Sequence, residues 1–512
     1  KAKESEGAIT AGRPRVTGKP FPLAAALAMC AALKQAGVHF VHWKSNDHLA
    51  EALAGLTDID IYVAPADRAA FETVMAGLNA AEINSQVWGT YPGIGDWLVL
   101  DDASGRFLHL HLHYALMTGL KRVKHLRLPW DVTLMANLRE DPSSGWPIPS
   151  AEMELLILLV RIWAKMPPWR RWFGNKIPSH IMRELNWLRA DASPGELTRL
   201  LAELFPRVDA ARVLPVLSDA SLSPSAVIPV AKLLYGELRP NFRMSWPAAL
   251  IMAAGRNSHM AVAKVLRKLM PDIRTGKTLP RPGLMIALVG SDGAGKSTLG
   301  RDLHKWLRFK LDVHSYYMGS GDGGTHALDW LRRSIRGLVR LIKGRKENKS
   351  RKSGEVKPEK PRGVFGKTAE LYQLVIMRHK IRLLRAARKL TAGGSMVLTD
   401  RYPQTQVIGI SDGPKIQGGR SFEWAARKEM TYYDQARELG PDIVIKLKIS
   451  PEAAHARKPD HDFDNIARKC QIVDALEFPQ CAVAVINAEQ PYADVLLAAK
   501  RAIWAHLTRR PA

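Results

Sequence analysis

The chain has 512 residues, 46% hydrophobic and 24% charged, which is typical of soluble proteins with about two to four domains. Its three cysteines lack metal-ligand spacing and its apolar runs are too short to cross a bilayer, which excludes disulfide-stapled and integral membrane proteins and favours the cytoplasm. The net charge of +26 is concentrated in residues 331–390, where 20 Lys and Arg stand against 4 Glu, and this block predicts an acidic partner.

The first 149 residues predict a disordered segment followed by a small α+β domain. Residues 1–20 are polar and contain Gly and Pro, which is typical of disorder. Residues 21–149 show patterns for a helix at 22–37, strands at 39–43 and 58–63, a helix at 65–78, and paired strands at 97–100 and 107–114. Asp58 and Asp60 alternate on their strand, so both carboxylates lie on one face, suited to holding a metal ion.

The order of these elements resembles the minimal nucleotidyltransferase fold over roughly residues 22–140. In that superfamily a Gly-Ser pair after the first strand grips the triphosphate, two carboxylates on the next strand bind Mg²⁺, and a later strand supplies a third. The resemblance therefore implies Mg²⁺ ligands at Asp58 and Asp60. The chain departs from the pattern at Lys44, which replaces the glycine, and at His111, which replaces the third acid, so nucleotidyl transfer is left open.

Two plainer interpretations of this region also stay open. Asp58 and Asp60 would suit a solvated strand edge, because a D-x-D pattern alone is a weak signal. His109, His111 and His113 alternate with leucines and could form a metal-binding row. The same alternation favours one polar face of a half-buried strand.

Residues 150–270 predict a wholly helical domain without a catalytic pattern. The expected helices are 151–164, 181–189, 194–204, 224–235, 246–254 and 259–269. We expect this domain to pack on the first one or to carry a surface for a partner. Residues 271–282, with three prolines and a glycine, predict a linker.

A phosphate-binding loop opens the last predicted domain, residues 283–512. It fits G-x-x-x-x-G-K-[ST], follows an apolar strand at 284–289 and precedes a helix at 299–310. The loop residues predicted to bind nucleotide are Gly290, Ser291, Asp292, Gly293, Ala294, Gly295, Lys296, Ser297 and Thr298. The glycines let backbone N–H groups close around phosphate oxygens, while Lys296 would reach the terminal phosphates and Ser297 would hold Mg²⁺.

Strands alternate with helices beyond this loop, which predicts a parallel sheet with helices on both faces. The further strands are expected at 313–318, 394–400, 442–449 and 482–488, before a closing helix at 492–507. Asp400 ends one of these strands, where an acid suits a second contact to Mg²⁺, and Arg401 follows at once. The predicted fold class of the chain is therefore α/β, with an α+β first domain and a helical middle domain.

The loop, the run Asp400-Arg401-Tyr402 and the segment from Pro441 to Arg457 resemble the thymidylate kinase family over roughly residues 283–508. The resemblance implies ATP and Mg²⁺ as cofactors. It implies catalytic roles for Lys296, Asp400, Arg401 and Arg457, a lid over ATP with Arg457 and Lys458, and an acceptor faced by Asp292.

The chain departs from that family in the half that recognises thymine. The family's Arg-Glu-Pro-Gly-Gly-Thr run is replaced by residues 318–324, and its thymine-holding run by residues 403–409. The phosphoryl-transfer half is present, so we expect an acceptor other than thymidylate.

Residues of about 325–365 predict an insertion that contains a basic amphipathic helix at 328–343. Its leucines and isoleucines form one stripe with Arg and Lys around it, which suits an anionic bilayer surface. The same pattern would serve a helix that docks on its own domain, so both interpretations stay open. Nucleic acid ranks third as a partner, because the segment has almost no aromatic side chains for base stacking.

The sequence thus predicts a Mg-ATP-dependent kinase that phosphorylates a small-molecule or glycan-linked acceptor. Fusions of this kind resemble proteins made with bacterial surface polysaccharides. One alternative is a non-catalytic nucleotide-binding switch or scaffold, held at the inner face of the membrane by the basic helix. A second alternative is a nucleic-acid end-processing enzyme.

Overall fold

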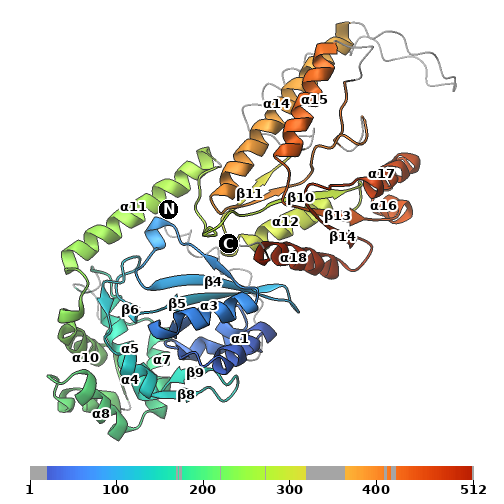
Figure 1. Cartoon of the computed structure of the whole chain (residues 1–512). Helices are drawn as coiled ribbons and strands as arrows, with labels where there is room; N and C mark the ends of the chain where they lie inside the picture. Colours follow the sequence, from blue (N-terminus) through green and yellow to red (C-terminus); the bar gives the residue numbers. More distant parts are fainter. Residues whose placement is uncertain are drawn as a thin grey trace. The chain divides into compact units, whose positions relative to one another are not determined.

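The computed structural model shows two compact units that divide between Leu269 and Met270, each with its own sheet (Figure 1). It describes residues 20–168, 171, 176–219, 221–270, 272–318, 364–408, 412–416 and 423–509. The predicted α/β class is confirmed. The predictions for residues 1–19, for the loop at 319–324 and for the basic helix at 328–343 fall outside the described residues.

A mixed five-stranded sheet organises the first unit. Its order is β1-β2-β5-β4-β3, with β2 and β5 parallel and all other neighbours antiparallel. Its elements are α1 (Ala24–Gln35), β1 (Phe40–His42), α2 (Leu49–Leu53), β2 (Ile59–Val63), α3 (Arg68–Gly77), β3 (Ala81–Ile83), β4 (Ile94–Asp101) and β5 (Arg106–His113). The strands and helices predicted here are confirmed, whereas the short β3 was not predicted.

Alternation along β5 separates the two faces of this sheet. One face buries the leucines of the strand in a core with α1 and α3; these are Leu108, Leu110 and Leu112. The other face carries His109, His111 and His113, whose side chains are 2%, 21% and 0% exposed. The half-buried interpretation is therefore wrong, because this face is largely covered as well, with Trp43 packed against His113. The solvated-edge interpretation is wrong for Asp60, because β2 lies inside the sheet.

Helix α5 (Ala151–Ala164) links the sheet to a helical layer. It begins where the Ser150 hydroxyl accepts the N–H of Met153, and it is buried over nearly its whole length. It contacts α7 (Ser179–Asp191), α8 (Pro194–Leu204) and α10 (Pro224–Glu237). One hydrophobic core joins the leucines of α5 to Trp43 and Tyr62 of the sheet region.

The remaining elements of the first unit are short, apart from one long helix. They are β6 (Met117–Thr118), β7 (Leu126–Arg127), α4 (Asp131–Ala136), β8 (Leu138–Glu140), β9 (Pro147–Pro149), α9 (Leu214–Ser218) and α11 (Trp246–Leu269). The two helices predicted at 246–254 and 259–269 form the single α11, since Gly255 costs a helix only about 1 kcal/mol. No described helix of the chain is both long and apolar enough to cross a bilayer.

A parallel five-stranded sheet organises the second unit, in the order β11-β12-β10-β13-β14. The strands are β10 (Met285–Gly290), β11 (Val313–Tyr316), β12 (Met396–Thr399), β13 (Ile443–Lys448) and β14 (Ala482–Asn487). The helices are α12 (Lys296–Leu307), α14 (Val364–Ala392), α15 (Glu423–Glu438), α16 (Pro451–Arg457), α17 (Phe463–Ala475) and α18 (Tyr492–Thr508). Alternate residues of β10 share a core with α14 and α17, which leaves its other face to α12. Helix α18 packs on α12.

Residues 275–279, within the stretch 271–282 predicted as a linker, belong to the second unit and are hydrogen-bonded to its sheet region. The N–H groups of Thr275 and Gly276 donate to Asp312 Oδ1 at 3.0 and 2.9 Å. The N–H of Leu279 donates to the carbonyl of Gly394 at 3.0 Å. These bonds hold the segment beside the ends of β11 and β12.

Candidate functional site

The phosphate-binding loop lies at the carboxyl end of β10, the central strand of the second unit. The chain leaves β10 toward β11 on one side, returns through β12, and then crosses to β13 on the other side. Strands β11 and β12 therefore lie on one side of β10, and β13 and β14 lie on the other. In open parallel sheets this switch point is where ligands bind, outside the carboxyl ends of the strands.

Glycine is required in this loop for steric reasons. Gly293 and Gly295 have φ of +86° and +85°, a region that side chains disfavour. A Cβ at Gly293 would lie 2.7 Å from the carbonyl oxygen of Ala454, a backbone atom that cannot swing away. Helix α12 starts directly after Gly295, so its first N–H groups point toward the loop.

Lys296 lies across the loop that precedes it. Its ammonium donates to the carbonyls of Gly290 at 2.8 Å and Ser291 at 2.7 Å. Burial, with repulsion from Arg401, lowers the pKa of Lys296 to about 8. Ser297 follows on the first turn of α12 and is exposed. The loop thus presents the partly desolvated ammonium of Lys296 beside the exposed hydroxyl of Ser297.

Asp400 and Arg401 follow the neighbouring strand β12 at the same edge of the sheet. Asp400 Oδ1 accepts the N–H of Met318 at 2.8 Å, while burial raises the pKa of this carboxyl. Arg401 Nη1 lies 3.6 Å from Asp412 Oδ2, and Lys380 donates to the same carboxylate at 3.2 Å. Asp412 is a site residue that the sequence did not signal, because a lone Asp in a turn has no distinguishing pattern.

The predicted lid residues lie on the other side of the loop. Arg457, the last residue of α16, donates to the carbonyl of Gly293 at 3.4 Å and to that of Ala488 at 2.9 Å. Lys458 caps the same helix. Asp292 forms an ion pair of 2.7 Å with Lys469 of α17, a cation that sequence analysis missed because its helix brings it back from far along the chain.

One pocket joins these parts of the second unit. Its walls combine the loop with an apolar side, and they include Leu288, Val289, Gly290, Ser291, Asp292, Lys296, Arg401, Tyr402, Asp412, Lys469, Val473, Leu476 and Phe478. The structure thus brings the loop and Arg401 to one cavity. Asp400 and Arg457 do not line this cavity: Asp400 follows β12 at the same edge of the sheet, and Arg457 contacts the backbone of the loop at Gly293. Such a cavity can hold phosphate groups at its polar end.

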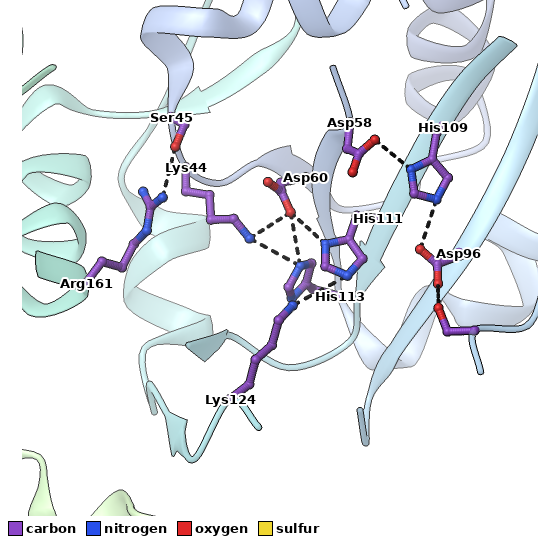
Figure 2. Close-up of polar contacts among 11 residues, drawn as sticks. Lys44, Ser45, Asp58, Asp60, Asp96, His109, His111, His113, Lys124 and Arg161 are labelled. Atoms are coloured by element: carbon purple, nitrogen blue, oxygen red, sulfur yellow. Dashed lines mark hydrogen bonds and ion pairs between the residues drawn. The ribbon is translucent and has the colours of Figure 1, made fainter. Parts of the chain in front are cut away.

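A second polar cluster lies in the first unit, centred on Asp60 (Figure 2). Asp60 Oδ1 is 2.7 Å from Lys44 Nζ, 2.9 Å from His111 Nδ1 and 3.4 Å from His113 Nε2. The parallel register places Asp60 directly beside His111, so the strands themselves impose this contact. Lys124 reaches the far nitrogen of His111 at 3.5 Å.

The charges in this cluster are set by burial and by close partners. Burial alone would raise the pKa of Asp60, but Lys44, His111 and His113 together hold it well below its usual range. Burial lowers the pKa of both histidines, that of His113 most strongly. The cluster is therefore one carboxylate facing two neutral imidazoles and an ammonium.

Asp58 and Asp60, predicted to bind one metal together, have different partners. Asp58 Oδ1 lies 2.8 Å from His109 Nδ1, whose other nitrogen is 3.0 Å from Asp96 (Figure 2). The Ser85 hydroxyl donates to Asp96 at 2.9 Å. Asp58 thus belongs to a separate chain of polar contacts, through His109 to Asp96, on the same face of the sheet.

Helix α5 supplies two groups to the loop that follows β1. Arg161 donates to the Ser45 hydroxyl at 3.0 Å, where Ser45 has a φ of +60°. Glu154 accepts both the N–H and the side-chain amide of Asn46, and burial raises the pKa of Glu154 to about 7. No sequence pattern indicates these residues, because only the fold brings α5 to the loop.

Two proteins of Escherichia coli (strain K12) are similar to this chain. The uncharacterized ATP-binding protein YghR is 32% identical over 241 residues, which cover 44% of this chain and 90% of YghR. The uncharacterized ATP-binding protein YghS is 30% identical over 232 residues, which cover 44% of this chain and 95% of YghS. No protein-family model matches the chain.

Proposed function

The chain belongs to the family of the E. coli ATP-binding proteins YghR and YghS, and we propose that it binds ATP and uses it as a phosphoryl donor. The observation that carries this proposal is the position of the second unit's glycine loop. It follows the central strand at the switch point, and Asp400 and Arg401 follow the adjacent strand at the same edge. This edge of the sheet would hold ATP and Mg²⁺ with the γ-phosphoryl group close to Asp400 and Arg401.

Each group in this arrangement has a role in the proposed reaction. The N–H groups of the loop and the Lys296 ammonium bind the β- and γ-phosphates. Ser297 and Asp400 would hold Mg²⁺, which supplies charge neutralisation when bound. The raised pKa of Asp400 fits that role, since a half-buried carboxylate gains most from a nearby cation. Arg401 and the lid residues Arg457 and Lys458 stabilise the transferring phosphoryl group.

The proposed acceptor is a small molecule or a glycan-linked group other than thymidylate. The second unit keeps the thymidylate kinase-like transfer residues, but residues 403–409 lack the thymine-holding run. The pocket wall beside the loop is instead made by Tyr402, Asp412 and Phe478. We expect thymidylate to be a poor substrate, and turnover of thymidylate at rates usual for that family would contradict this.

For the first unit we propose binding of a phosphate-bearing ligand without efficient nucleotidyl transfer. Lys44, Lys124 and Arg161 gather positive charge around the Asp60 cluster. Two-metal transfer needs a third carboxylate, and His111 stands in that position. Pyrophosphate release from labelled nucleoside triphosphates that disappears in Asp58→Ala would overturn this proposal.

The kinase proposal is tested by Lys296→Ala, with Lys305→Ala on the same helix as a matched control. We expect Lys296→Ala to lower ADP production by about a thousandfold, because its ammonium would stabilise the charge of the terminal phosphates during transfer. Lys305 is exposed, and its removal should change little. The measurement is ADP release against a panel of nucleotides, sugars and lipid-linked glycans. ATP binding without turnover on any acceptor would favour the nucleotide switch, the alternative in which the basic helix holds the protein at a membrane.

A further inference from the structure

Three potential metal ligands meet on the inner strands of the first unit. The ligand atoms of Asp60, His111 and His113 all lie within 4.8 Å of one another (Figure 2). We infer that these three side chains form a binding site for a first-row transition metal ion of the Zn²⁺ class, through the Asp60 carboxylate, His111 Nδ1 and His113 Nε2. This site goes beyond the proposed kinase function and does not depend on it.

The donor types decide the class of the ion. Mg²⁺ prefers oxygen ligands in an octahedral arrangement and usually keeps several waters. Imidazole nitrogen suits Zn²⁺ and the other late first-row ions, and two imidazoles with one carboxylate are a common donor set for them. The replacement of the expected third acid by His111 therefore changes the preferred ion. Three protein ligands also leave a position open for water or a substrate oxygen.

Strand register holds the three ligands rigidly. Asp60 pairs with His111 and Tyr62 with His113 across the parallel strands β2 and β5. The alternation of side chains then places Asp60 against both histidines on one face. The His113 ring is fully buried and stacks edge-on against Trp43, with ring centroids 5.1 Å apart. Ligands on inner strands keep their spacing better than ligands on loops.

The ammonium of Lys44 occupies the position that the metal ion would take. Its ammonium lies 2.7 Å from Asp60 Oδ1 and 3.4 Å from His113 Nε2, so a cation already meets two of the three ligands (Figure 2). The same ammonium is 4.2 Å from the centroid of the Trp43 ring, an aromatic surface that attracts cations. A divalent ion must displace Lys44 to bind, and the ammonium is thus its direct competitor.

The test uses the full-length, tag-free chain with Co²⁺ and Zn²⁺ as probes. We expect about one Co²⁺ per chain, with a visible absorption band of a nitrogen-containing site that Zn²⁺ removes and millimolar Mg²⁺ does not. His111→Asn and Asp60→Asn should weaken Co²⁺ binding by at least about tenfold. His48→Ala removes an imidazole that is 50% exposed and should leave the band unchanged.

Lys44→Met gives the sharpest result, because it removes the competitor and none of the ligands. We expect it to tighten Co²⁺ binding by about tenfold or more, since the ammonium no longer opposes the divalent charge. His111 is 21% exposed whereas His113 is fully buried, so His111→Asn is the histidine variant that disturbs the fold less, and circular dichroism checks this. Absence of stoichiometric Co²⁺, equal binding by His111→Asn and wild type, or weaker binding by Lys44→Met would each overturn the inference.

Discussion

The two units hold charge in opposite ways. In the second unit the phosphate-binding loop is made of backbone groups, and glycines allow the chain to fold closely around a ligand. In the first unit the Asp60 cluster is made of side chains from three separate segments, the loop after β1, β2 and β5. The difference shows why one site has a specific sequence signature and the other only a weak one. A backbone site needs particular residues that follow one another in the sequence. A side-chain site needs the right pairing register between strands that are far apart in the sequence.

Breaking the backbone site should have the largest effect. Gly293→Ala places a methyl group 2.7 Å from the Ala454 carbonyl at a φ of +86°, which forces the loop open. We expect kcat/KM for ATP to fall by about a thousandfold, because several phosphate contacts are lost together. Gly37→Ala is the control: its φ is +67°, but nothing lies within 4 Å of the added Cβ. Equal activity of the two variants would show that the loop tolerates a side chain.

Breaking the side-chain site should cost stability. Asp60→Asn leaves the ammonium of Lys44 buried without its anion, and breaking such a pair costs about 3 kcal/mol of unfolding free energy. Hydrogen exchange of peptides from β2 and β5, in the presence of a chelator, measures this loss within the first unit. Glu140→Gln breaks the exposed pair with Lys34 and should cost less than about 1 kcal/mol. The double variant Lys44→Met, Asp60→Asn should recover most of the loss, and a double variant no more stable than Asp60→Asn would contradict the explanation.

The smallest expected effect is a pH dependence confined to the backbone site. Lys296 has a pKa of about 8 in the free protein, so it is charged at pH 7 and neutral at pH 9. Bound phosphate favours the charged form and raises this pKa. The affinity for ATP should therefore be constant below about pH 8 and fall above it, by at most about tenfold per pH unit. Lys296→Arg, which stays charged, should remove the dependence, and the same slope in this variant would assign the titration to another group.

Local patterns predicted most of the elements in both units. The alternation of His and Leu fixes β5, and the run from Leu284 to Val289 fixes β10, because the period of the side chains follows from the strand itself. The position of Asp400 beside the loop was also predictable, since an acid directly after an apolar strand must lie at the carboxyl edge of a parallel sheet. The basic helix at 328–343 stays a prediction.

The contacts between distant segments were not predictable from local patterns. Nothing near Asp292 indicates that Lys469 pairs with it, and nothing near Ser45 indicates Arg161. The histidine row was expected to face water on one side, because alternation shows that two faces differ and not what covers each of them. What covers this face depends on Trp43 and its surroundings, which the fold supplies.

The core shared by α5 and the sheet of the first unit has a practical consequence for recombinant fragments. Trp43 and Tyr62 are buried against the leucines of α5, and Glu154 and Arg161 of this helix satisfy polar groups of the loop after β1. A fragment that ended at residue 149 would expose these aromatic surfaces and leave those polar groups without their hydrogen-bond partners. Such a fragment should be insoluble or quickly degraded by proteases, whereas residues 20–269 keep the whole core and should be expressible by themselves.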